Sequence, residues 1–147
     1  MESVQVTING EPNMLYKHFT EKLLGLQGLI ITNVEENEKS IIIYAEMERK
    51  EHTCICCGTA TNTVHDYREQ IIKDIPAFGK LVKIVLRKRR YCCKCCGKRF
   101  LEINSFLPKY HRITNRLSAF VIDKLRDERS FTSVAREVNL SVTTVIR

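Results

Sequence analysis

The chain reads Cys54-Ile55-Cys56-Cys57-Gly58 at one point and Cys92-Cys93-Lys94-Cys95-Cys96-Gly97 at another, and these two stretches hold all seven of its cysteines. Each stretch contains the pattern Cys-x-x-Cys-Gly. Two such pairs supply four thiolates, which is the tetrahedral ligand set of a closed structural zinc site. The glycine after each pair suits a tight turn with positive φ. We therefore predict one structural zinc ion held by Cys54, Cys57, Cys93 and Cys96.

The choice of the second pair has an alternative, because Cys92 and Cys95 also have the Cys-x-x-Cys spacing. We prefer Cys93 and Cys96, since they repeat the first stretch position for position. His65 is then expected to be a surface or packing residue. A redox role for the pairs is disfavoured, because redox Cys-x-x-Cys motifs sit at a helix start in a βαβ setting.

The length of 147 residues allows one ordinary domain or two small ones, and 44% hydrophobic residues indicate a globular chain. No apolar run approaches the ~18 residues of a membrane span. The N-terminus, Met1-Glu2-Ser3, lacks the basic-then-apolar plan of a signal peptide. We expect a cytoplasmic protein with no membrane partner, in which seven thiols favour metal over disulfides.

The basic charge is concentrated in one segment. Residues 87–116 carry ten Lys and Arg against the single acid Glu102, so this segment has a net charge of +9, whereas the remainder has −2. Such a local cluster favours a polyanion, most often nucleic acid, over a basic surface with no partner. Part of the cluster could instead offset the negative charge of a four-thiolate zinc site.

Hydrophobic periodicity indicates helices at both ends and strands between them. Leu81, Ile84 and Leu86 do not share one face of a regular strand, so a bulge or burial on both faces is expected there. We expect residues 29–103 to form a small antiparallel β unit stapled by zinc. The expected elements are a helix over 12–27, a hairpin of strands over 29–35 and 40–48, an extended segment over 63–73, a loop over 74–79 and a strand over 80–91.

The C-terminal part resembles a helix-turn-helix in its internal pattern. Thr114 is the expected N-cap of a helix that runs to about residue 128, and a second helix is expected from near Ser130 to near Val138. Ala135 is small where two helices would cross, and Asn139 tolerates the positive φ that the turn needs. Ser141 would cap the helix that enters the major groove.

The predicted fold class is therefore α+β, with an N-terminal helix and β hairpin, a zinc-stapled antiparallel β module and C-terminal helix-turn-helix helices. We expect an N-terminal zinc-finger domain over 1–107 and a helix-turn-helix segment over 108–147. No phosphate loop, nucleophile with a base, or metal-binding acidic pair is present in the sequence, so no catalytic residue is assigned. The candidate DNA-binding residues are Arg87, Lys88, Arg89, Arg90, Lys98, Arg99, Arg112, Arg116, Ser141, Thr143, Thr144 and Arg147.

The motifs together resemble the front half of the ISL-three family of bacterial insertion-sequence transposases, over roughly residues 20–147. The resemblance is carried by Leu24-Gly25-Leu26, Cys54-x-x-Cys57-Gly58, His65-Asp66-Tyr67-Arg68, Asp74-Ile75-Pro76 and Arg89-Arg90-Tyr91-Cys92-Cys93-x-x-Cys96-Gly97-x-Arg99-Phe100-x-Glu102, followed by the helix-turn-helix.

The resemblance implies a zinc finger and a helix-turn-helix that bind the terminal inverted repeats of the element, ahead of an RNase-H-like domain with an Asp-Asp-Glu triad and Mg²⁺. The catalytic carboxylates carry over to nothing here, so we expect a truncated, non-enzymatic DNA-binding portion. Its expected partners are double-stranded DNA at element ends and a second copy or a partner transposase. The alternatives are a stand-alone zinc-containing transcriptional regulator and an RNA-binding zinc module, for which Tyr91, Phe100 and Tyr110 would supply stacking rings.

Overall fold

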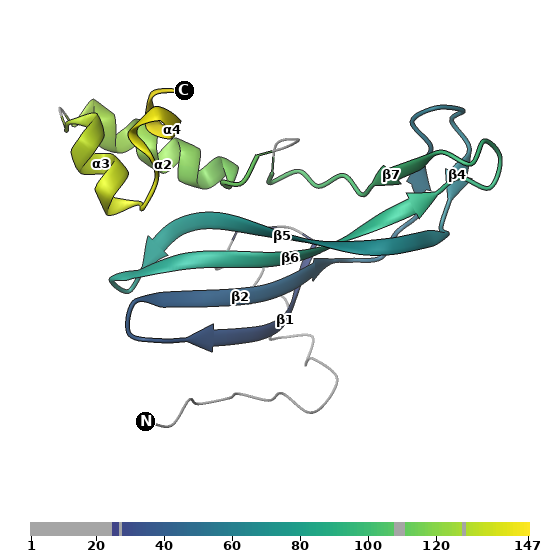
Figure 1. The fold of residues 1–147 in the computed structure, drawn as a ribbon, viewed down its shortest axis with the longest axis horizontal. Coiled ribbons are helices and arrows are strands. Elements are labelled where there is room, and N and C mark those ends of the chain that lie inside the picture. The colour runs from purple at the N-terminus through teal and green to yellow at the C-terminus, as the bar shows by residue number, and fades with distance from the viewer. Residues whose placement is uncertain (1–24, 27, 108–110, 128) are drawn as a thin grey trace.

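The computed structural model describes residues 25–26, 28–107, 111–127 and 129–147. It is an α+β fold, with a mixed sheet, a small two-stranded sheet and a group of short helices (Figure 1). The elements are β1 Leu29–Glu36, β2 Ser40–Met47, β3 His52–Thr53, β4 Ala60–Thr61, β5 Val64–Ala77, β6 Lys80–Cys92, β7 Arg99–Leu101, α2 Asn115–Arg126, α3 Phe131–Glu137 and α4 Val142–Ile146.

The predicted fold class is confirmed, and so are the hairpin β1–β2 and the three C-terminal helices. The helix expected over 12–27 falls almost wholly outside the described residues. The division into domains at 107/108 stays a prediction. No helix in the described part of the chain is long and apolar enough to cross a membrane.

The sheet is mixed rather than antiparallel, which corrects the sequence-based expectation. Its strand order is β1-β2-β6-β5, and β2 pairs with β6 in parallel, whereas β1–β2 and β5–β6 are antiparallel. After β2 the chain passes through the first cysteine turn and then forms β5, which is an edge strand of the sheet. The strand β6 then inserts between β5 and β2, so it runs in the direction of β2.

The loop expected over 74–79 is also wrong, because β5 continues to Ala77. Only Phe78 and Gly79 form the turn, and both have positive φ, 53° and 72°. A two-residue turn of this kind matches the twist of an antiparallel pair. The strand register shifts between Asp74 and Ala77, which accommodates Pro76, a residue with no amide hydrogen.

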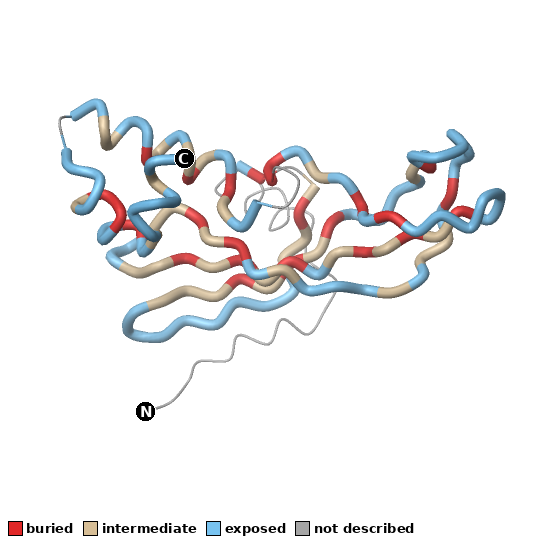
Figure 2. Tube along the Cα trace, turned by 45° about the horizontal axis from the view of Figure 1, so that its top comes forward, coloured by how far each residue is buried: buried red, intermediate tan, exposed pale blue. Residues whose placement is uncertain are grey.

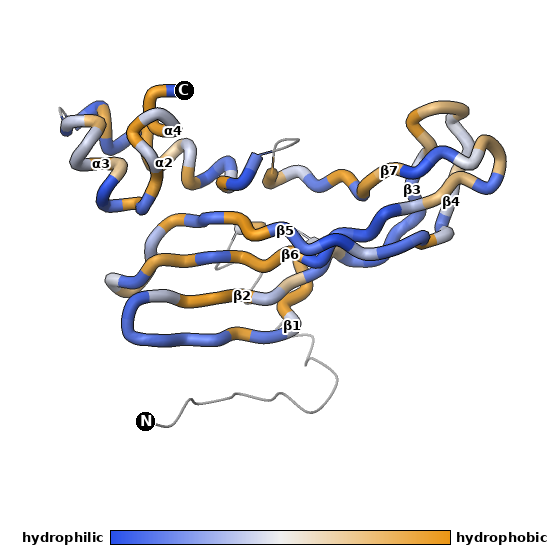
Figure 3. Tube along the Cα trace, in the orientation of Figure 1, coloured by the Kyte–Doolittle hydropathy of each residue, from blue (hydrophilic) through white to orange (hydrophobic). Residues whose placement is uncertain are grey.

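Strand β6 buries both of its faces, one after the other. Val82, Ile84 and Leu86 face the main core with β1 and β2, whereas Tyr91, on the opposite face, belongs to a second core beneath the cysteine turns. The sequence predicted either a bulge or burial on both faces of this strand, and the structure shows burial on both faces. Buried positions recur along β6 from Val82 to Tyr91, and Figure 2 shows buried segments both beside the helices and toward the cysteine turns. Figure 3 shows a hydrophilic stretch of β5 and β6 between these two parts.

The helices lie over the far half of β5 (Figure 1) and are attached to it by backbone bonds. The Lys73 amide donates to the Arg112 carbonyl (2.8 Å), and the Thr114 amide donates to the Lys73 carbonyl (3.1 Å). Ile75 of β5 packs against the helical core. The sheet therefore fixes the position at which α2 begins.

Asp74 anchors this junction from inside the protein. Its side chain is fully buried, accepts a hydrogen bond from the Thr114 hydroxyl (2.7 Å) and pairs with the Arg116 guanidinium, whose Nε lies 2.7 Å from Oδ1. Thr114 in turn caps α2 by accepting from the Leu117 amide at 3.2 Å. A buried carboxylate is held in place here by two donors from the start of α2.

We predict that Asp74→Asn lowers the free energy of unfolding by about 2 kcal/mol, because Arg116 loses its buried ionic partner and the Thr114 hydroxyl donates to a weaker, uncharged acceptor. Urea denaturation of the zinc-loaded protein measures the change. Asp123→Asn on the exposed part of α2 is the matched control, expected within about 0.5 kcal/mol of wild type. Equal stability of the two variants would contradict the anchoring role.

Candidate zinc centre and nucleic-acid interface

The two cysteine turns have the same backbone geometry. In each turn the carbonyl of the first cysteine accepts a hydrogen bond from the glycine amide (3.0 and 2.9 Å), and its amide donates to a carbonyl just beyond the glycine (2.9 Å in both). Both glycines have positive φ, 72° and 70°. The residues involved are Cys54, Gly58 and Thr59 in the first turn and Cys93, Gly97 and Lys98 in the second.

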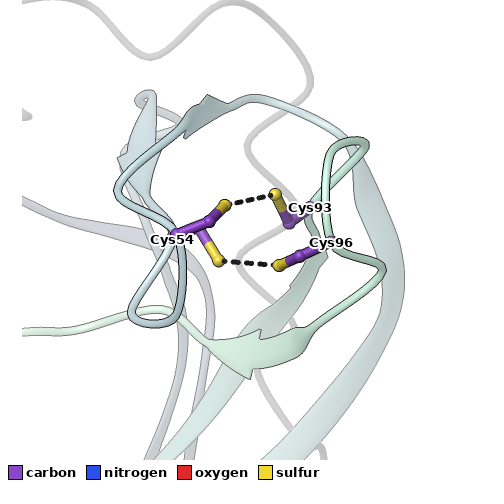
Figure 4. Close-up of side chains that lie close together, drawn as sticks. Cys54, Cys93 and Cys96 are labelled. Atoms are coloured by element: carbon purple, nitrogen blue, oxygen red, sulfur yellow. Dashed lines mark hydrogen bonds between the residues drawn. The ribbon is translucent and has the colours of Figure 1, made fainter.

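The turns face each other and bring four thiols together (Figure 4). The Sγ atoms of Cys54, Cys57, Cys93 and Cys96 all lie within 4.8 Å of one another. Cys54 Sγ lies 3.6 Å from Cys96 Sγ, and Cys57 Sγ lies 3.5 Å from Cys93 Sγ. Tetrahedral zinc with Zn–S bonds of ~2.3 Å needs sulfur–sulfur separations of about 3.8 Å. The four thiols therefore fit one zinc ion.

The other three thiols lie outside this group. The Cys92 thiol points to the Cys93 and Gly97 carbonyls at 3.8 and 3.9 Å, and Cys56 and Cys95 are exposed. The geometry thus brings Cys93 and Cys96, rather than Cys92 and Cys95, to the first pair. His65 is exposed and is not in the group.

The thiols differ in how readily they lose their protons. A hydrogen bond with the Thr59 hydroxyl, together with the Thr59 amide and the Cys93 thiol, lowers the pKa of Cys57 to about 6. The Lys98 amide lowers the pKa of Cys96, but burial and the neighbouring thiols raise it more, to about 12. Four thiolates this close together would repel one another, which opposes the loss of all four protons. A bound divalent cation neutralises this charge and so favours the deprotonated thiolates.

A small aromatic core supports the turns from below. Tyr91 is fully buried, lies 4.5 Å from the His52 ring and 6.1 Å from the Phe100 ring, and packs with Cys54 and Cys93. This core is too small to hold the turns by hydrophobic burial alone. Zinc would therefore supply much of the stability of this end of the molecule.

Four of the predicted DNA-binding cations are already engaged within the protein. Arg89 is 5% exposed, donates to the Met47 carbonyl (2.5 Å) and pairs with Glu102 (3.5 Å) and Glu46 (3.4 Å). It closes the point where β6 changes partner from β2 to β7. We correct the expectation for Arg89, because a buried guanidinium with two carboxylate partners cannot reach DNA.

Arg90 and Arg116 are likewise held by carboxylates. Arg90 binds Asp66 through two hydrogen bonds of 2.8 and 2.6 Å, and Arg116 binds Asp74. Arg87 stacks over the Tyr67 ring at 3.9 Å, yet its side chain stays 54% exposed. A count of basic residues therefore overstates the charge that is free to bind a polyanion.

Lys88, Lys98, Arg99 and Arg112 form the other group. Their side chains make no ion pair or hydrogen bond in the part of the chain that the structure describes. Lys98 and Arg99 lie on the second cysteine turn and β7, and Arg112 precedes α2. Lys88 lies on β6, so the four cations come from four different parts of the chain.

The helices form the expected helix-turn-helix. Asn139 has φ of 53° between α3 and α4, and the Leu140 amide donates to the Ala135 carbonyl at 2.9 Å. Ala135 is buried and lets the elements approach closely. Val134 and Val138 pack on α2 in a core that α4 joins through Val145.

Two of the predicted contact residues bond to each other at the start of α4, where Ser141 is the N-cap. The Ser141 hydroxyl accepts from the Thr144 amide (3.1 Å) and lies 2.7 Å from the Thr144 hydroxyl. Thr143 and Arg147 are exposed. The side chains that remain free to contact a ligand on α4 are therefore fewer than the sequence suggested.

We predict that the wild-type chain binds one zinc ion and that Cys54→Ser or Cys93→Ser lowers the zinc content well below one per chain. Cys56→Ser and Cys95→Ser, matched changes in the same turns, should keep one zinc ion, because these thiols lie outside the group. Metal analysis of purified protein measures both. Affinity should fall as pH falls, since protons compete with the metal for the thiolates. Zinc loss in Cys56→Ser would refute the assignment.

A second prediction concerns the turn. Asn139→Val should cost about 1 to 2 kcal/mol of stability, because a β-branched residue is strained at positive φ, whereas Asn139→Gly should be close to neutral. Thermal denaturation of the two variants measures the difference. If both variants melted alike, the positive φ would not matter to the helix-turn-helix.

Comparisons with known proteins agree with these two structural units. The family model described as the zinc-finger of transposases IS204, IS1001, IS1096 and IS1165 matches residues 50–96. The model described as the helix-turn-helix domain of transposase family ISL3 matches residues 102–147. No solved structure matches significantly.

A curated relative covers both units. The transposase for insertion sequence element IS1001 from Bordetella parapertussis is 32% identical over 135 residues, which is 90% of this chain and 33% of the relative. The chain thus spans about a third of the length of that relative, and neither family model describes a catalytic domain. The predicted family and the structural zinc ion are confirmed: this chain carries the zinc finger and the helix-turn-helix of the ISL3 transposase family.

Proposed function

We propose that this chain binds duplex DNA with sequence preference and that its target is the terminal repeats of an insertion element. The helix-turn-helix carries the proposal: α3 and α4 cross at Ala135, turn at Asn139 and leave the outer side of α4 exposed. In such motifs the second helix enters the major groove and the first crosses the backbone. The matched family and the IS1001 transposase support the choice of element ends.

The residues divide between reading and positioning. Thr143 on α4 and Arg147 at its C-cap are exposed candidates for contacts to base edges, while Ser141 and Thr144 hold the start of the helix. The zinc ion would be structural, since four thiolates leave no open coordination position. The unpaired cations Lys98 and Arg99 lie on the zinc unit and suit phosphate contacts.

The RNA-binding alternative loses its main support. Tyr91 and Phe100, two of the three rings expected to stack on bases, are 0% and 7% exposed, and Tyr110 lies outside the described residues. Single-stranded RNA readers need accessible rings. The stand-alone regulator would use the same DNA chemistry, so the location of the preferred site, at element ends or at a promoter, separates it from the transposase assignment.

We predict zinc-dependent binding to the ends of a related element, with at least tenfold preference over scrambled duplex at moderate salt. Fluorescence anisotropy across a salt series, with and without a zinc chelator, measures it. Thr143→Ala/Arg147→Ala should reduce the preference, whereas Thr132→Ala/Arg136→Ala on the exposed side of α3 is the matched control. Equal binding to both duplexes, or tighter binding to structured RNA, would overturn the proposed function.

A further inference from the structure

An open groove of about 910 Å³ lies between the zinc end and the helices. It is lined by the first cysteine turn, the middle of β5 and β6, β7 and the segment that leads to α2. Figure 1 shows that segment running alongside the β5–β6 pair between the two structural units. The groove therefore adjoins both the zinc finger and the helix-turn-helix.

Four cations line the groove, each from a different part of the chain. They are Arg68 of β5, Lys88 of β6, Arg99 of β7 and Arg112 before α2. Two acids line it as well. Glu102 is buried and bound to Arg89, which leaves Glu69 as the exposed acid opposite four cations.

These cations are poorly neutralised by the protein. Lys88, Arg99 and Arg112 have no ion pair or side-chain hydrogen bond within the described ranges. Arg68 lies 3.8 Å from Asp66, but that carboxylate already makes two hydrogen bonds to Arg90. By contrast, Arg89, Arg90 and Arg116 each have a carboxylate partner. Three of the unpaired cations of residues 87–116 (Lys88, Arg99 and Arg112) therefore line one groove, together with Arg68 of β5.

Lys88 is half-buried and makes no ion pair or hydrogen bond within the described residues, and its nearest carboxylate, Glu102, is already bound to Arg89. Burial lowers the pKa of Lys88, and Glu102 offsets this effect only in part. A half-buried cation whose neighbouring carboxylate is shared with another cation is only partly compensated in the free protein, and a bound anion would improve that compensation.

The walls of the groove are also fixed in place. The Gln70 side chain donates to the His111 carbonyl (2.8 Å), and the Lys73 amide donates to the Arg112 carbonyl. The approach of Arg112 to the sheet is therefore set by backbone bonds. The backbone that carries Arg112 is thus positioned before an anion binds, which lowers the ordering cost of binding.

We propose that this groove holds the sugar-phosphate backbone of the same duplex that the helix-turn-helix reads, so that the chain grips DNA at two points. The inference rests on the proposed DNA binding and adds a site to it. Phosphates would lie on Arg68, Lys88, Arg99 and Arg112, while the exposed apolar side chains Leu101 and Ile103 lie where deoxyribose would pass.

The groove reaches the helical unit, because Asn115, the first residue of α2, lines it together with Arg112. We therefore expect the groove contacts to lie next to the site read by α4, on the side of the zinc finger.

The test compares two double variants that remove equal charge from the full, zinc-loaded chain. Arg99→Ala/Arg112→Ala changes the groove, and Lys39→Ala/Lys50→Ala changes exposed cations outside it. We expect the slope of log K against log salt for the groove variant to be shallower by about 1.8, the value for two phosphate contacts. The control should keep the wild-type slope, and hydroxyl-radical footprinting should show the protected backbone shortened only in the groove variant.

The outcomes separate this inference from the proposed function. If wild type binds no duplex DNA, the proposed function and the inference both fail. If wild type binds and the groove variant, with its zinc and its unfolding midpoint intact, keeps the wild-type slope and footprint, the groove inference alone is wrong. A groove variant that changes sedimentation of the free protein but not the salt slope would assign the groove to a second copy, and would also overturn it.

Discussion

The meeting of four thiols from two distant turns is the constraint on which the rest of the structure depends. Cys54 and Cys57 precede β5, Cys93 and Cys96 follow β6, and the long β5–β6 hairpin returns one turn to the other. Little apolar surface is buried beside them, essentially Tyr91 and Phe100. Structural zinc sites contribute about 10 to 16 kcal/mol of apparent binding energy in small fingers. In this protein that binding energy would stabilise the end of the β5–β6 hairpin at which the two cysteine turns meet.

Sequence reasoning found the parts that local chemistry decides. The cysteine pairs, the caps Thr114 and Ser141, the start of the second helix near Ser130 and the positive φ of Asn139 are properties of a few neighbouring residues. The parallel pairing of β2 with β6 is different, because the sequence of a strand does not indicate which other strand it pairs with. The extension of β5 through Asp74 was missed for the same reason, since Thr114 and Arg116, forty residues away, hold that carboxylate in the interior.

The basic cluster shows the same limit in electrostatic terms. Composition gives residues 87–116 a net charge of +9, but their acidic partners Glu46, Asp66 and Asp74 lie outside that segment. Arg89, Arg90 and Arg116 are therefore structural ion pairs that a one-dimensional count assigns to a ligand. The alternation of β6 offered one signal, because Arg89 lies two residues before the aromatic Tyr91 and therefore on the same face of the strand.

The same ion pairs explain how the zinc end and the helices can act as one unit. Arg89 and Glu102 tie β6 to the segment after β7, and Asp74 ties β5 to the start of α2. Between these two anchors the connecting segment is bonded to β5 through Gln70 and Lys73. Lys73 also donates from its ammonium group to the Asn139 carbonyl (2.5 Å), in the turn before α4. The sheet therefore contacts the helical unit both at the start of α2 and in the turn before α4, and these contacts help to fix the orientation of α4. The cysteine turns hold the other end of the sheet together. A ligand that contacts both units would meet a surface whose geometry is largely set before binding, which reduces the ordering cost of association.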